Sequence, residues 1–460
     1  MLRVNRSILV NVIFIMVLAT LAESCRIKEG SPGIEEKREQ SVHSPVAWSR
    51  DAVLYEVNIR QYTPEGTLSA FMEHLPRLKE LGVDILWLMP IHPIGEKKRK
   101  GPLGSYYSIS DYRAVNPEFG SMDDLKELVK KAHEMDMKVL LDWVANHTAW
   151  DHPWIEEHPD WYTTNDKGKV IAPDPDWTDV ADLNFDNMAM REAMIRAMEY
   201  WVKEADIDGY RCDVAWGVPV DFWDETRERL DEIKPVFMLA EAAEADLLVE
   251  AFDMCYGWEF HHLMNEAAEG EEIDFNAYFE KVDTVYGADD YIMNFITNHD
   301  ENSWAGTEFD RMGQGVAAFA VLTYTVPGMP LIYSGQEVGF DKELEFFKKD
   351  LIDWTDNGWT EFYRKLNAMK KDLSVLRHGD EGAPIEILTD PVDYPLFTFK
   401  RQNEEETLLA VFNFSPEKQQ VNFDLQGSFV NYLKEGQPRV DLSETITLDP
   451  WGYKVLLERE

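Results

Sequence analysis

The chain has 460 residues, enough for one large domain and one or two smaller ones, and its 45% hydrophobic and 12% aromatic content excludes a disordered polymer. Its formal net charge of −41 argues against a nucleic-acid partner, because phosphates would be repelled, and favours a neutral ligand. Solubility or adaptation to a salty medium is the simplest explanation of the acidity.

The first 25 residues have the layout of a signal peptide. Arg3 and Arg6 precede an apolar run at 8–21 that is too short for a membrane span. The segment 22–25 resembles a bacterial lipoprotein processing site, which would leave Cys25 lipidated, although Glu23 departs from the usual small residue. We therefore expect an exported protein, held at a membrane only through this anchor or else simply secreted, with 26–47 as a flexible tether.

Short apolar runs then alternate with helical patterns over residues 48–376. Strands are predicted at 52–57, 83–88, 138–142, 207–213, 236–240, 251–255, 291–297 and 330–334. Helices are predicted at 68–81, 125–135, 188–205, 222–233, 275–286 and 312–324. Continuous apolar strands separated by helices indicate parallel strands buried on both faces, and eight of them favour a closed (β/α)8 TIM barrel, an α/β fold.

Two segments depart from this alternation. Residues 146–187, after the third strand, are rich in Pro, Asp, Trp and His without periodicity, and are expected to form an inserted domain over the barrel's mouth. Two uses are open for its tryptophans, stacking on a ligand or packing the insert: Trp150, Trp154, Trp161 and Trp177. Residues 377–460 carry strand and turn patterns at 396–400, 407–412, 421–423 and 453–457, which predict a C-terminal antiparallel β-sandwich domain.

Acidic residues and their hydrogen-bonding partners follow several of the predicted barrel strands, where such barrels carry chemistry. These residues are Asp142, Asn146, His147, Arg211, Asp213, Glu241, His299 and Asp300. Alternation in a strand points Arg211 and Asp213 to the same side, and the arginine is expected to keep the aspartate ionised. Glu241 follows an apolar strand, which is expected to raise its pKa. Three carboxylates, two histidines and an arginine, without a nucleophilic Ser or Cys, suit cleavage of a glycosidic bond.

Several motifs resemble those of glycoside hydrolase family 13, the α-amylase family, in the same order. They are DWVANH at 142–147, GYRCD at 209–213, Glu241 after an apolar strand, and FITNHD at 295–300. VADLN at 180–184 resembles the family's fifth motif, and GSYYSISDY at 104–112 resembles its aromatic motif after the second strand. The resemblance extends from about residue 48 to the end, because the family also has an inserted domain and a C-terminal β domain.

The resemblance implies that Asp213 is the nucleophile and Glu241 the acid and base. Asp300 would hold the sugar's hydroxyls and favour its distorted conformation. Four further residues would bind the sugar or the nucleophile, with the tyrosine stacking beneath the ring: Tyr107, His147, Arg211 and His299. Asp142 is expected to orient its neighbours.

The resemblance implies no cofactor for the chemistry, and it departs from the family pattern at a calcium-linked position. Trp216-Gly217 stand where many members have Lys-His. Asn146 and Asp182 match other calcium-linked positions, so a structural calcium ion is an expectation with an incomplete set of oxygen ligands. The segment 240–243 also lacks an aromatic residue often found there, which leaves product specificity undefined.

We therefore predict a retaining hydrolase of α-1,4-linked glucans such as starch or maltodextrins, with the carboxyl groups of Asp213 and Glu241 about 5 to 6 Å apart; about 9 Å would indicate inversion. An α-glucosidase, cyclomaltodextrinase, neopullulanase or glucanotransferase is the alternative on the same scaffold. No separate β domain precedes the barrel, which favours an amylase. A noncatalytic carbohydrate-binding or transporter-associated relative is disfavoured, because all three acids are present. The sequence leaves the oligomeric state undefined.

Overall fold

The computed structural model describes residues 44–423, 427–434, 436 and 439–459, all within one compact unit. The predicted signal peptide at 1–25 and most of the predicted tether at 26–47 lie outside the described residues, so both stay predictions. Within the described ranges, no helix combines the length and the apolar character that crossing a membrane requires.

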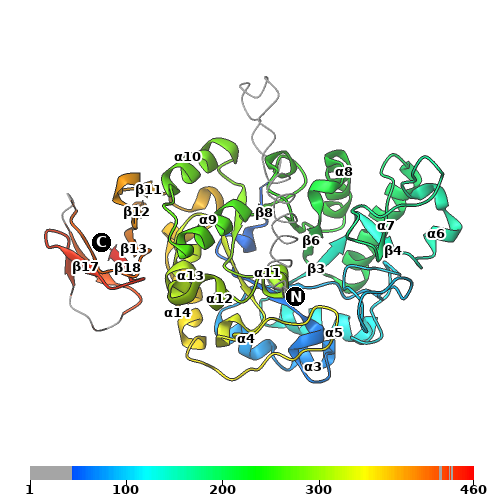
Figure 1. Ribbon diagram of the computed structural model, residues 1–460, viewed down its shortest axis with the longest axis horizontal. Helices are drawn as coiled ribbons and strands as arrows, with labels where there is room; N and C mark the ends of the chain where they lie inside the picture. Colours follow the sequence, from blue (N-terminus) through cyan, green and yellow to red (C-terminus); the bar gives the residue numbers. More distant parts are fainter. Residues whose placement is uncertain (1–43, 424–426, 435, 437–438, 460) are drawn as a thin grey trace, which may run out of the picture. The chain divides into compact units, whose positions relative to one another are not determined.

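Eight parallel strands close into a barrel in the order β1-β10-β9-β8-β7-β6-β3-β2, which confirms the predicted fold (Figure 1). Each strand pairs in parallel with both neighbours, including β1 with β10, so the barrel has no open edge. The strands are β1 (Leu54–Val57), β2 (Ile85–Leu88), β3 (Lys138–Val144), β6 (Gly209–Asp213), β7 (Phe237–Ala240), β8 (Met254–Tyr256), β9 (Tyr291–Asn294) and β10 (Met329–Tyr333).

Alternation along the strands decides which residues face the barrel's interior. In β6, Tyr210 and Cys212 pack with the core that surrounds the barrel, so Arg211 and Asp213 point inward. In β1, Leu54 packs with the interior core, and Glu56 two residues later shares its face. The inner face is apolar toward the start of the strands and polar at their carboxyl ends, where chemistry is expected in this fold.

Gly209 allows β6 to lie close to β7. Its φ is +151°, and a Cβ at this position would lie 1.9 Å from the carbonyl oxygen of Phe237. Any side chain here would therefore displace the strand that carries Arg211 and Asp213.

The longer helices that surround the barrel mostly match the predicted ones. They are α3 (Leu68–Met72), α4 (Leu75–Leu81), α5 (Met122–Glu134), α7 (Met188–Ala205), α8 (Val220–Asp231), α9 (Trp258–Glu269), α10 (Phe275–Val285), α13 (Val316–Thr325) and α14 (Thr360–Asp372). Short α-helices are α2 (Ile59–Tyr62), α6 (Trp154–Glu157), α11 (His299–Trp304) and α12 (Glu308–Met312). The 3-10 turns are η1 (Ala47–Ser49), η2 (Pro159–Trp161), η3 (Ala215–Gly217), η4 (Ala245–Leu248), η5 (Gly313–Gly315), η6 (Gln336–Val338), η7 (Ser374–Leu376), η8 (Gly379–Glu381) and η9 (Pro391–Asp393).

The prediction of one helix at 68–81 is wrong, because α3 ends at Met72 and a second helix, α4, begins at Leu75 with Pro76 in its first turn. Proline has no N–H for a continuing helix but fits a first turn. The helix predicted from residue 312 begins only at Val316, after Gly313 takes a φ of +51°. α9 and α14 have no predicted counterpart, and both begin without a capping side chain.

The insert after β3 contains a small antiparallel pair, β4 (His147–Ala149) with β5 (Val180–Asp182). In the register of this pair, His147 lies opposite Asp182. The insert is therefore tied to the barrel at its first residues, where β3 ends.

The C-terminal strands form two antiparallel sheets, as predicted (Figure 1). Alternation along β13 sends Phe412 toward the barrel-side core and Val411 toward the second sheet, so the larger sheet is covered on both faces. The larger sheet has the order β11-β12-β13-β18-β15-β16 and the smaller one is β14-β17. Their bounds are β11 (Glu386–Ile387), β12 (Leu396–Gln402), β13 (Glu406–Asn413), β14 (Gln419–Val421), β15 (Ser428–Asn431), β16 (Val440–Asp441), β17 (Ile446–Leu448) and β18 (Tyr453–Arg459).

Candidate active site

The carboxyl ends of the barrel strands surround a cavity of about 260 Å³. The three acids Asp213, Glu241 and Asp300 all line it, although they end or follow three different strands. Three of the four predicted sugar-binding residues line it as well: Tyr107, His147 and His299. The structure thus brings together residues spread over almost 200 positions of the chain.

Arg211, the fourth predicted binding residue, is fully buried and joins the acids. Its Nη1 donates to Oδ1 of Asp142 and to Oδ1 of Asp213, both at 2.9 Å. Its Nη2 lies 3.0 Å from Oε2 of Glu241, an ion pair rather than an aligned hydrogen bond. Its Nε donates to the hydroxyl of Tyr256 at 3.1 Å. A single rigid guanidinium therefore fixes Asp213 and Glu241 relative to each other.

Both carboxyl groups have raised pKa values. Burial raises the pKa of Asp213 well above its ordinary range, and repulsion from Glu241 adds to this, while Arg211 opposes both. Burial also raises the pKa of Glu241, against the opposing effect of Arg211. The sequence-based expectation that Arg211 keeps the pKa of Asp213 low is therefore wrong: Arg211 does lower it, but burial and the repulsion from Glu241 outweigh that effect. Burial and mutual repulsion thus disfavour the ionisation of both carboxyl groups at once.

Backbone strain lies beside this pair. Val214, directly after Asp213, has a φ of +46°, which a β-branched residue rarely adopts. In this conformation its N–H donates to Oε2 of Glu241 at 2.7 Å. The unusual backbone thus holds one candidate catalytic acid against the strand end that carries the other.

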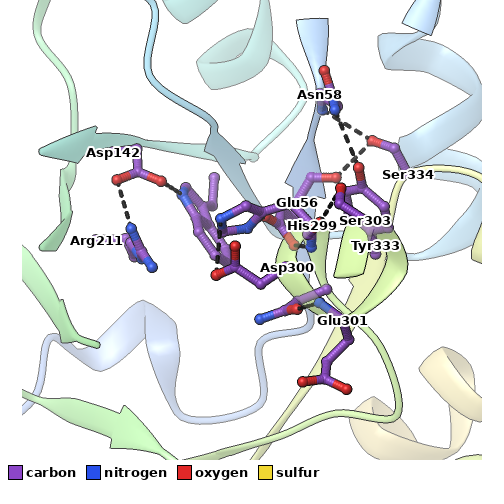
Figure 2. Close-up of polar contacts among 12 residues, drawn as sticks. Glu56, Asn58, Asp142, Arg211, His299, Asp300, Glu301, Ser303, Tyr333 and Ser334 are labelled. Atoms are coloured by element: carbon purple, nitrogen blue, oxygen red, sulfur yellow. Dashed lines mark hydrogen bonds and ion pairs between the residues drawn. The ribbon is translucent and has the colours of Figure 1, made fainter. Parts of the chain in front are cut away.

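Asp142 uses both of its oxygens within the protein. Oδ1 accepts from Arg211 (Figure 2). Oδ2 accepts from Nε1 of Trp87 at 3.0 Å and from the hydroxyl of Tyr107 at 3.1 Å. The strand register places it directly opposite Arg211. These contacts suit a residue that orients its neighbours, the task predicted for it.

His299 lies between two carboxylates (Figure 2). Its Nδ1 is 2.5 Å from Oε1 of Glu56, and its Nε2 is 3.3 Å from Oδ2 of Asp300 and 2.7 Å from the hydroxyl of Tyr107. Burial lowers the pKa of His299, but Asp300 and Glu56 outweigh burial and raise it to about 9. The ring is therefore an imidazolium at neutral pH, a fixed positive charge beside the cavity.

Replacing Glu56 by glutamine is expected to lower the pKa of His299 from about 9 toward its ordinary value of 6.5, because one of the two anions that raise it is lost. In the native protein the charged ring stabilises the fold fully below pH 6.5, and this contribution is lost as the pH rises through 9. NMR titration of ring-labelled histidine measures the change. Glu343→Gln, at an exposed acid, is the control, and an equal shift there would contradict the assignment.

His147 and one of the four tryptophans of the insert line the cavity, whereas the other three tryptophans do not. Burial lowers the pKa of His147 to about 4, so this ring is neutral. Trp177 also lines the cavity, with its ring 5.7 Å from that of His147. Trp150 and Trp161 are buried within the insert, and Trp154 packs edge-on against Trp161. Of the four, Trp177 is therefore the one placed to meet a ligand in this cavity.

The residues predicted to hold calcium do not form an oxygen-rich site. The amide nitrogen of Asn146 lies 3.2 Å from Nδ1 of His147, and Asp182 lies across the β4–β5 pair. Calcium takes about six to eight oxygen ligands, whereas among the described residues no three His, Cys, Asp or Glu side chains converge in a way that holds a metal. Asn146 and Asp182 alone supply too few oxygen ligands for the ion, so the calcium site stays a prediction.

Several residues in or next to the cavity had no counterpart in the sequence-based site. Glu56 interrupts an apolar strand, which is a signal that a sequence reader can use. Trp304 ends α11, and the remaining residues lie in loops, all without any such signal: Lys100, Ser105, Asp179, Phe346 and Phe347.

A family model described as the catalytic domain of alpha amylase matches residues 37–178 and 175–378, and a model described as a beta-galactosidase C-terminal domain matches residues 398–458. A solved α-amylase from Lactobacillus plantarum has a TM-score of 0.82 and 30% identity, covering 89% of this chain and 99% of its own. A noncanonic maltogenic α-amylase, AmyB from Thermotoga neapolitana, has a TM-score of 0.81, 28% identity and the same coverages.

Curated relatives have related names. Alpha-amylase MalA of Haloarcula japonica is 28% identical over 434 residues, which cover 88% of this chain but only 61% of that protein. A cyclomaltodextrinase from a Bacillus species is 26% identical over 425 residues, covering 81% of this chain and 74% of that protein.

Proposed function

Since the chain belongs to the α-amylase family of glycoside hydrolases, we propose that it hydrolyses α-1,4-linked glucans with retention of the anomeric configuration. One observation carries the proposal. Asp213 and Glu241 are bound to the same buried guanidinium on the wall of a cavity large enough for a sugar, and their environment disfavours the ionisation of both at once. A retaining glycosidase needs one ionised and one protonated carboxyl group at close range.

In the proposed mechanism, the Asp213 carboxylate attacks the anomeric carbon while Glu241 donates its proton to the departing glycosidic oxygen. The bond to the leaving sugar breaks and a β-linked glycosyl ester of Asp213 forms. Glu241, now ionised, takes a proton from water, and the resulting hydroxide displaces Asp213 to give the α-anomer. The proposed separation of the two carboxyl groups is about 5 to 6 Å, which leaves too little space for an attacking water between them.

The remaining cavity residues suit the binding of one sugar ring. Asp300 accepts hydrogen bonds from hydroxyls, and the imidazolium of His299 donates to an oxygen. Tyr107 presents an aromatic ring on the same wall, 5.3 Å from the ring of His299 and nearly parallel to it. We assign these three residues to the sugar whose anomeric carbon reacts.

Incubation of the protein with starch, pullulan and cyclodextrin in parallel tests the proposal. Starch is expected to be hydrolysed, and NMR of freshly released product is expected to show the α-anomer before mutarotation. A first product in the β form would contradict retention, and stable starch together with stable cyclodextrin would contradict the substrate class.

A cyclomaltodextrinase is the second candidate, because curated relatives and solved structures with that name match more than 80% of this chain. Cyclodextrin hydrolysed much faster than starch in the same panel would favour it.

We also propose that residues 1–25 direct export and that Cys25 carries a lipid, since Arg3 and Arg6 precede the apolar run. The mass of the mature amino terminus tests this.

A further inference from the structure

Three segments far apart in the sequence meet along one side of the cavity. Nζ of Lys100, in the loop after β2, lies 3.1 Å from Oδ1 of Asp179 and donates to the carbonyl oxygen of Asp176 at 2.8 Å, both in the insert. In the same loop, the N–H of Leu103 donates to the carbonyl oxygen of Phe347, after β10, at 3.1 Å. The loop after β2 therefore bridges the insert and the loop after β10.

Aromatic side chains extend this line of contacts along the cavity. The ring of Trp304, at the end of α11, lies 5.5 Å from that of Phe346 and 5.9 Å from that of Phe347. Phe346 stacks on Tyr107 at 6.3 Å between centroids. We call the six cavity-lining residues of this line of contacts the rim: Lys100, Trp177, Asp179, Trp304, Phe346 and Phe347.

The loop after β10 is held by buried polar side chains of α2. Arg60 donates to the carbonyl oxygens of Gly104 and Phe346, at 3.2 and 3.3 Å, and so joins the two loops. Gln61 donates to the carbonyl oxygen of Lys348 at 2.8 Å and accepts from the N–H of Asp350 at 2.6 Å. These contacts hold the loop after β2 and the loop after β10 in place beside the cavity.

The rim lies on one particular side of the reacting bond. Trp304 is in the same short helix as Asp300, and Phe346 stacks on Tyr107, so both flank the residues assigned to the reacting sugar. Asp213 and Glu241 approach the anomeric carbon from β6 and β7, on other strands. We therefore assign the rim to the side of the cavity that receives sugars preceding the cleaved bond.

The size of the cavity sets how many such sugars fit. Its 260 Å³ is below the range of about 300 to 1,000 Å³ that drug-sized ligands fill, which leaves space for roughly one or two sugar rings. A longer chain on this side would have to displace Lys100 from Asp179, whose side chain is 6% exposed, and so leave that carboxylate buried without its ion partner.

We propose that the rim makes this enzyme release short products, one or two glucose units long, from the non-reducing ends of maltooligosaccharides. The inference rests on the proposed function and adds the product length and the residues that set it. In the rim, the Lys100–Asp179 ion pair blocks a longer chain, and Trp304 provides an apolar surface beside it.

Maltoheptaose with a chromophore on its reducing end tests the proposal. Wild-type protein is expected to yield labelled chains shortened by one or two units. Two variants change the rim: Lys100→Met keeps the length of the side chain and removes its charge, and Trp304→Ala removes a 48% exposed aromatic residue. Each is expected to raise about tenfold the share of labelled products that have lost three or more units. A tenfold change is at the lower end of what one pocket contact contributes to discrimination between substrates.

Lys97→Met, at an exposed lysine of the same loop, is the matched control and is expected to keep the wild-type pattern. The proposed role of the rim would be overturned by mid-chain cleavage in the wild-type protein. It would also be overturned by an unchanged product pattern in both rim variants at wild-type melting temperatures. Neither result would contradict the proposed glucan hydrolase activity. Failure of the wild type to cleave maltoheptaose at all would overturn the proposed function, and the rim with it.

Discussion

Replacing Asp213 by alanine is expected to lower kcat on starch by on the order of 10⁴-fold or more, the scale on which a hydrolase loses activity without its nucleophile. Without this carboxylate no glycosyl ester forms, and the remaining acids cannot substitute for it because Arg211 and Val214 hold Glu241 in place. The steady-state rate on maltooligosaccharides measures the loss. Asp246→Ala, at an exposed acid, is the control for the change of charge.

Sodium azide distinguishes a lost nucleophile from a damaged site. In Asp213→Ala, azide has room to enter the vacated volume and attack the anomeric carbon of an α-glycosyl fluoride, so fluoride leaves and a β-glycosyl azide forms. This product requires attack from the face that Asp213 occupies. An α-glycosyl azide, or full activity without azide, would contradict the assignment of Asp213.

Sequence reasoning predicted those parts of the site that depend on strand periodicity. Arg211 and Asp213 are two residues apart in an apolar strand, so alternation alone places them on one face. The barrel predicted from eight strands then brings Glu241 and Asp300 to the same end, which the shared cavity shows.

Interactions between distant residues were not available to that reasoning. Glu56 occupies an inner-face position in β1, but its partner His299 is 243 residues away and its proximity follows only from the closed barrel. The pKa of Asp213 was predicted in the wrong direction because its burial, the largest cause, and its repulsion from Glu241 both follow from the closed barrel. The sequence shows Arg211 beside Asp213, but not that Glu241 contacts the same guanidinium.

Loop contacts were the least predictable. Lys100 and Asp179 are polar residues in irregular segments, and neither has a pattern that distinguishes it from solvent-exposed neighbours such as Lys97. Only the fold shows that their loops meet beside the cavity and that Trp304 continues the same wall.

Replacing Glu241 by alanine is expected to separate substrates by their leaving groups. Hydrolysis of starch requires a proton on the departing oxygen, so its rate is expected to fall by about 10²- to 10⁴-fold, the usual contribution of general acid catalysis. An α-maltosyl fluoride leaves as fluoride without that proton, and the first step on this substrate is expected to be nearly unchanged. Equal losses on both substrates would contradict the role of Glu241 as the proton donor.

The pH dependence provides an independent measurement on the same residue. Burial raises the pKa of Glu241, so the wild-type kcat/KM is expected to persist above the ordinary carboxyl range and to fall only as the shared proton of the Asp213–Glu241 pair is lost. In Glu241→Gln this alkaline fall is expected to disappear, because the amide does not titrate.

Azide added to Glu241→Ala is expected to give an α-glycosyl azide, since Asp213 still forms the β-linked ester and azide then displaces it. The opposite anomers from the two alanine variants would assign the attacking and the proton-donating carboxyl groups separately, whereas a β-glycosyl azide from Glu241→Ala would exchange their roles.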